Sequence, residues 1–81
     1  MNKEFNYKIV ERIAVLSQNG NATKELNIIS YDGAPAKYDL RNWKHDGLGS
    51  RMFKGITLTD DEFGALVKAI AEYNERTDAY A

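Results

Sequence analysis

The chain has 81 residues and a formal net charge of −1, which is the size of one small domain spanning residues 1–81. It has no cysteine and a single histidine, His45, so a disulfide framework and a Cys/His zinc site are both excluded. No apolar run approaches membrane-spanning length, and the first residues lack the apolar core of a signal peptide, so we expect a cytoplasmic protein. A single core of this size gives modest stability, which favours support from a second copy of the chain.

The charge is unevenly distributed along the chain. Residues 37–58 carry five cations against two acids, and residues 59–81 carry six acids against two cations. A basic middle therefore precedes an acidic end, and local potential rather than net charge attracts an anionic ligand.

The first half of the chain predicts two strands. Residues 7–17 are rich in Ile, Val and Leu, and the Asn19-Gly20 pair that follows is a strong turn signal. Residues 24–31 then alternate, with Leu26 and Ile28 on one face and Asn27 and Tyr31 on the other.

Two more strands are predicted before residue 59. Pro35 cannot donate to a strand ladder and marks a connection, after which residues 37–44 alternate again. The two-glycine loop of residues 45–50 leads to a fourth strand at residues 51–58. Links this short favour an antiparallel meander.

The last element is predicted to be a helix. Thr59 and Glu62 have the spacing of a capping box, and Asp60 and Asp61 suit the positive end of the helix dipole. We expect the helix to end at Asn74 or at the charged residues that follow it. An apolar stripe follows the helical period, at Phe63, Leu66, Val67, Ile70 and Tyr73. This stripe packs either within its own chain or partly against a second copy, and the pattern leaves both open.

The sequence gives little support for an enzyme. The acids at residues 60–62 are explained by the helix start, and His45 is interpreted as a solvated loop residue. Ser17, Ser30 and Ser50 lack a partner base at a recognisable spacing, and the glycines after His45 do not match a phosphate-binding loop. We expect no catalytic activity, no cofactor and no metal.

Basic and aromatic residues alternate on the third and fourth predicted strands. Lys37, Arg41 and Trp43 share one face, and Tyr31 is placed on the same face of the preceding strand. Single-stranded nucleic acid binds to such surfaces, because bases stack on rings while Lys and Arg neutralise phosphates. A half-solvated sheet face with ordinary aromatics is the alternative, since strands favour such residues.

The Lys54-Gly55 pair interrupts the fourth strand. A glycine inside a strand marks a bend or a place where a ligand approaches closely. We therefore place Lys54 and Gly55 at the binding edge, while Ile56 and Leu58 are expected to anchor the strand to the core.

The string YDLRNWK, followed by GLGSRMFKGITLTDDEF, resembles a known family. It is similar to the C-terminal single-stranded-DNA-binding domain of the transcriptional coactivator positive cofactor four, in particular its small bacterial YdbC-like branch. Asp39 to Trp43 match a D-I-R-E-aromatic block, and Lys54 to Leu58 match a K-G-I-S-L block. The resemblance covers roughly residues 7–75.

The resemblance implies an α+β fold, a curved four-stranded antiparallel sheet followed by one C-terminal helix (ββββα), forming a homodimer. Each protomer would bind single-stranded DNA, with RNA as a second ligand, and with little sequence preference. Arg41 and Lys54 carry over from the family's contact residues, and Lys44 takes a site that is aromatic in some relatives. The aromatic–basic–glycine corner is incomplete, because Asp32 follows Tyr31 where the family has a lysine.

The expected function is therefore non-catalytic binding of single strands in transcription, replication or repair. The alternative is a regulatory dimer whose basic face binds an acidic protein partner. The nucleic-acid-binding residues expected from pattern and resemblance together are Lys24, Asn27, Tyr31, Lys37, Arg41, Trp43, Lys44, Arg51, Phe53 and Lys54.

Overall fold

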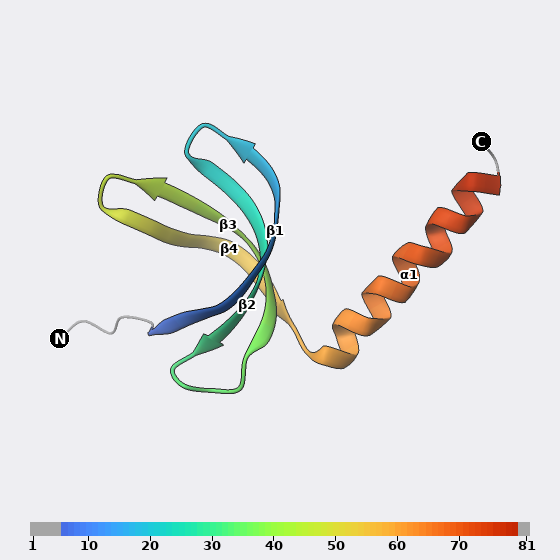
Figure 1. Cartoon of the computed structure of the whole chain (residues 1–81), viewed down its shortest axis with the longest axis horizontal. Helices are drawn as coiled ribbons and strands as arrows, with labels where there is room; N and C mark the ends of the chain where they lie inside the picture. The colour runs from blue at the N-terminus through green and yellow to red at the C-terminus, as the bar shows by residue number, and fades with distance from the viewer. Residues whose placement is uncertain (1–5, 80–81) are drawn as a thin grey trace.

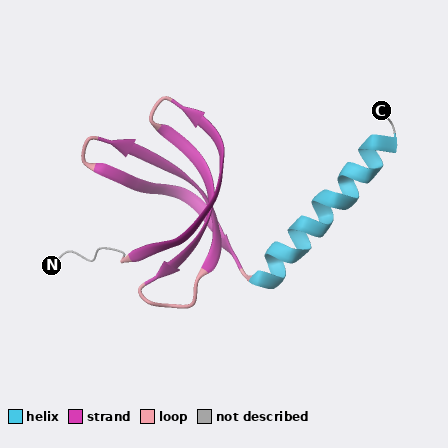
Figure 2. Ribbon diagram, in the orientation of Figure 1, coloured by secondary structure: helices cyan, strands magenta, loops and turns pink. Residues whose placement is uncertain are grey.

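The computed structural model describes residues 6–79 and has the element order ββββα (Figure 1). The elements are β1 (Tyr7–Asn19), β2 (Ala22–Tyr31), β3 (Lys37–Asp46), β4 (Gly49–Leu58) and α1 (Asp60–Ala79). The strands form one antiparallel sheet in the order β1-β2-β3-β4, joined by short turns (Figure 2). The predicted ββββα fold is confirmed.

Irregular pairing curls the sheet strongly (Figure 1). The β1–β2 ladder has three register shifts, and the β3–β4 ladder has one between Arg41 and Trp43. Each extra residue in one strand bends that strand and increases its right-handed twist. The sheet therefore folds over its own inner face and buries it without a covering helix.

Alternate residues of β2 and β3 form this inner face. Its buried members are Thr23, Glu25, Asn27, Ile29, Asp39 and Trp43. The Trp43 ring is 1% exposed and meets Tyr7 of β1 edge-on, with ring centroids 5.7 Å apart. Four of the six buried residues are polar or charged, so the inner face depends on hydrogen bonding as well as on apolar packing.

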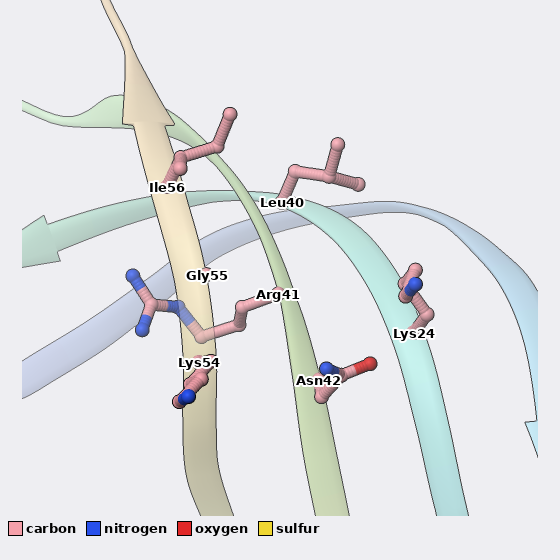
Figure 3. A pocket seen from close by; sticks show the side chains of 7 residues that line it. All are labelled: Lys24, Leu40, Arg41, Asn42, Lys54, Gly55 and Ile56. Atoms are coloured by element: carbon pink, nitrogen blue, oxygen red, sulfur yellow. The ribbon is translucent and has the colours of Figure 1, made fainter.

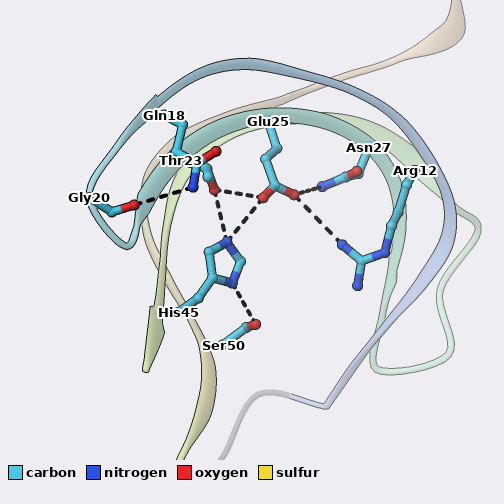
Figure 4. Close-up of polar contacts among 8 residues, drawn as sticks. All are labelled: Arg12, Gln18, Gly20, Thr23, Glu25, Asn27, His45 and Ser50. Atoms are coloured by element: carbon cyan, nitrogen blue, oxygen red, sulfur yellow. Dashed lines mark hydrogen bonds and ion pairs between the residues drawn. The ribbon is translucent and has the colours of Figure 1, made fainter. Parts of the chain in front are cut away.

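Glu25 is the centre of a polar network on the inner face (Figure 4). Its carboxylate accepts hydrogen bonds from Thr23 Oγ1 at 2.6 Å and Asn27 Nδ2 at 3.2 Å, and lies 3.2 Å from His45 Nε2. The other ring nitrogen of His45 lies 2.7 Å from Ser50 Oγ on β4. His45 therefore belongs to β3 and links three strands, so its interpretation as a solvated loop residue was wrong.

The surroundings of Glu25 have opposing effects on its pKa. Burial raises the pKa, but the hydrogen bonds from Thr23, Asn27 and His45, together with the charge of His45, outweigh burial and lower it. Arg12 of β1 adds an ion pair at 3.7 Å. The folded state therefore favours the ionised carboxylate.

The start of α1 agrees with the predicted capping box. Glu62 donates its backbone N–H to Thr59 Oγ1 at 3.1 Å, and Thr59 donates its own to Glu62 Oε1 at 2.8 Å. The predicted end, at Asn74 or the charged residues after it, was wrong, because the helix continues to Ala79. No glycine or proline follows Gly64 within α1, and Arg76 lies over the Tyr73 ring at 5.8 Å. No helix within residues 6–79 is long and apolar enough to cross a membrane.

The helix projects away from the sheet (Figure 1). At its first turn Phe63 is stacked on Tyr38 of β3, with ring centroids 3.8 Å apart. The rest of the apolar stripe is exposed, namely Leu66, Val67, Ile70 and Tyr73. Ile56 is also 56% exposed, so its predicted core position was wrong. The radius of gyration is 15.5 Å, against about 12 Å expected for a compact chain of this length.

We predict that acid weakens the fold partly through Glu25. Its folded pKa lies below the ordinary value of 4.5, so its stabilising contribution is complete above that pH. The contribution is lost as the pH falls through the lowered folded pKa. The free energy of urea unfolding should therefore decrease in this acid range, and Glu25→Gln should show a smaller decrease. Glu11→Gln, at an exposed carboxylate of β1, is the control, and equal acid dependence in both variants would contradict the assignment.

Candidate nucleic-acid interface

Arg41 of β3 is held by a buried carboxylate. Its Nε and Nη2 donate to the two oxygens of Asp39 at 2.6 and 2.7 Å, and Tyr31 Oη donates to the same carboxylate at 2.6 Å. Asp39 is fully buried. The hydrogen bonds to Asp39 raise the pKa of Arg41, while burial and then the bond to Asp39 raise the pKa of Tyr31. The positive charge of Arg41 is thus already neutralised inside the protein.

Arg41 also lies across β4 at Gly55 (Figure 3). The two residues are direct partners in the ladder, and Arg41 Nη1 donates to the Phe53 carbonyl at 3.0 Å. A Cβ at residue 55 would overlap the Arg41 Cβ and lie 2.6 Å from both the Arg41 Cα and the Leu40 carbonyl oxygen. The glycine therefore permits close approach of β3 rather than of a ligand.

Two adjacent hollows lie on the opposite, outer face of the sheet. One, of about 360 Å³, is lined by Lys24, Leu40, Arg41, Asn42, Lys54, Gly55 and Ile56 (Figure 3). The other, of about 430 Å³, is lined by Ala22, Asn42, Trp43, Lys44, Phe53 and Lys54. Because Asn42 and Lys54 line both, the hollows form one continuous surface across β2, β3 and β4, which we call the outer groove.

The outer groove is basic with an apolar floor. Lys24, Lys44 and Lys54 are exposed, and the described residues lining the two hollows include no acid. Leu40 supplies part of the floor, and the Phe53 side chain is 49% exposed. This arrangement can neutralise phosphates and stack a ring on a flat base.

Several of the expected binding residues lie at this groove. Lys24, Lys44, Phe53 and Lys54 come together in it from three strands. Arg51 pairs with Lys44 in the ladder, beside the groove, and its guanidinium lies 3.1 Å from Asp46.

The other expected residues are placed differently. Trp43 and Asn27 are each 1% exposed, so neither side chain is available to a base, and their predicted surface positions were wrong. Tyr31 and Arg41 are engaged with Asp39, although Arg41 contributes to the lining of one hollow. Lys37 is exposed at the start of β3 but lines neither hollow.

Sequence reasoning missed Asn42, which lines both hollows. The sequence contained a signal for Asn42, because the even-numbered residues Leu40, Asn42 and Lys44 share one face of β3. The other face of β3 carries Lys37, Arg41 and Trp43, which is the stronger pattern for a nucleic-acid surface. The spacing of Asp39 and Arg41, two residues apart on one strand, was the clue that this second face carries an internal ion pair.

Within residues 6–79, no cluster of three or more His, Cys, Asp or Glu side chains is suited to hold a metal ion.

No family model matches the chain. The chain is 43% identical over 67 residues to an uncharacterized protein of Treponema pallidum (strain Nichols). The aligned part covers 82% of this chain and 76% of that protein. The chain belongs to the same family as this Treponema pallidum protein.

Proposed function

We propose that the protein binds single-stranded DNA, with RNA as a second ligand, through the outer groove. The observation that carries the proposal is the set of three exposed lysines, Lys24, Lys44 and Lys54, around a groove that also contains an exposed ring. None of the three has an ion pair within the described part of the chain. The resemblance to the positive cofactor four family points to the same class of ligand.

The groove suggests a division of roles. The lysines neutralise phosphates, Phe53 stacks on a base, and Leu40 and Ile56 contact the faces of sugars or bases. Asn42 offers one donor group and one acceptor to a base edge. Such contacts tolerate most sequences, so we propose weak sequence preference and a non-catalytic role in cytoplasmic transcription, replication or repair.

A homodimer is the second part of the proposal. The exposed stripe of α1, at Leu66, Val67, Ile70 and Tyr73, is too apolar to be left in water without cost. Leu26 and Ile28, partly exposed apolar residues of the outer sheet face, line neither basic hollow. A second copy presents both surfaces again, so a symmetric pair can bury them together.

For the binding site, we predict that Lys54→Ala weakens binding of a labelled oligo-dT and reduces the dependence on salt. Loss of one phosphate contact should lower the slope of log affinity against log salt by about 0.7. Fluorescence anisotropy at several salt concentrations measures both quantities. Lys68→Ala, at an exposed lysine of α1, is the matched control and should leave both unchanged.

Failure of the wild-type protein to bind oligo-dT at low salt would contradict the proposal. The alternative partner, an acidic protein, makes a different prediction. A complex with such a protein should withstand short homopolymer DNA, whereas a nucleic-acid site should exchange freely between oligonucleotides.

For the dimer, we predict that Ile70→Glu converts the protein to a monomer. Ile70 is 51% exposed on α1, so the change should leave the protomer folded while placing a charge in the proposed interface. Sedimentation equilibrium and circular dichroism measure mass and fold together. A monomeric wild-type protein at micromolar concentration would contradict the dimer.

A further inference from the structure

The turn between β3 and β4, residues 46–49, contains a fully exposed leucine. Leu48 is 100% exposed and stands between two glycines at the tip of a hairpin with ten-residue strands. Isolated exposed apolar residues are common on protein surfaces. What distinguishes Leu48 is the way its turn is held and where the turn lies relative to the outer groove.

Side chains fix the shape of this turn. Asp46 Oδ1 accepts the backbone N–H of Leu48 at 2.9 Å, and Asp46 Oδ2 accepts Arg51 Nη2 at 3.1 Å. Gly49 has a φ of 122°, a conformation that other residues rarely adopt. One carboxylate thus joins the tip to β4, so Leu48 is presented on a defined turn.

The turn lies beyond one end of the outer groove. Ladder pairs lead to it in sequence, from Lys44 with Arg51, through His45 with Ser50, to Asp46 with Gly49. Lys44 lines the second hollow, so this hollow reaches the last pairs before the turn. Arg51 offsets the charge of Asp46, which reduces repulsion of a phosphate backbone there.

We propose that Leu48 is an apolar wedge that opens the end of a duplex joined to a bound single strand. This inference rests on the proposed function, because the outer groove must hold the single-stranded tail. A strand that leaves the groove toward Lys44 passes the turn, where Leu48 meets the first base pair of the duplex. Apolar side chains inserted between bases unstack them in this way, at a cost repaid by other contacts.

The partner is a single-strand/double-strand junction rather than a second protein, because the turn follows the end of the outer groove at Lys44. An apolar protein-docking site would be expected to include neighbouring apolar residues. The residues adjoining Leu48 in sequence are instead glycine, aspartate and serine. The wedge therefore acts on DNA held by the groove.

The test uses a DNA hairpin with an oligo-dT tail and 2-aminopurine in the first base pair, prepared with the tail at either end. Binding of the wild-type protein should raise 2-aminopurine fluorescence several-fold for at least one tail polarity, because unstacking relieves quenching. Leu48→Ala should bind free oligo-dT with unchanged affinity but lose the rise, and Leu48→Met should retain it. Leu16→Ala, at an exposed leucine of β1 that lines neither hollow, is the control.

The outcomes separate the two proposals. Wild-type binding to oligo-dT without any fluorescence rise, or an equal rise with Leu48→Ala, overturns the wedge and leaves single-strand binding standing. Loss of oligo-dT affinity in Leu48→Ala assigns Leu48 to the groove itself and also overturns the wedge. Absence of oligo-dT binding by the wild type overturns both.

Discussion

The structure depends on one contact, the side chain of Arg41 lying across Gly55 and paired with Asp39. A buried carboxylate is costly unless a cation and hydrogen bonds compensate it, and Arg41 supplies both through two short bonds. Removing Arg41 alone would leave that carboxylate uncompensated, a change that costs about 3–5 kcal/mol in buried pairs. The same guanidinium binds the Phe53 carbonyl, so β4 is fixed at the irregularity where Phe53 and Lys54 enter the outer groove.

The curved sheet has two chemically different faces, and the Arg41 contact stabilises this curvature. The inner face contains ion pairs and hydrogen bonds around two buried carboxylates, Glu25 (Figure 4) and Asp39. The outer face leaves Lys24, Lys44 and Lys54 without an ion pair among the described residues. Three cations without an ion pair are therefore gathered on the outer face, although both faces are rich in charged residues.

Most of the fold follows from local sequence signals, and most errors concern which face points inward. The short turns, the alternation and the capping box at Thr59 were sufficient to predict four strands and a helix. Trp43 and Asn27 were misplaced because period-two alternation separates two faces without saying which is buried. In a flat sheet covered by a helix, the charged and aromatic face would be solvated. Here the register shifts of β1 fold the sheet over that face instead.

Among the candidate binding residues, exposed side chains were easier to predict from the sequence than side chains that pair inside the protein. Lys54 and Lys44 are exposed and line the groove as expected. Arg41 was expected to hold phosphate, but its guanidinium is paired with Asp39 on the same strand, and alternation alone does not predict this pairing. Gly55 was associated with a ligand because its close neighbour, the backbone of β3, becomes evident only once the ladder register is known.

The most direct test is to replace Gly55 with alanine and measure unfolding by urea together with oligo-dT affinity. The added Cβ must displace Arg41 or β4, so we expect a loss of about 1–3 kcal/mol in stability. Oligo-dT binding by the folded protein should weaken, since Phe53 and Lys54 move with β4. Gly64→Ala, in the open surroundings of α1, is the control and should leave binding unchanged while raising stability by up to about 1 kcal/mol. A Gly55→Ala protein as stable and as tightly binding as the wild type would contradict the account.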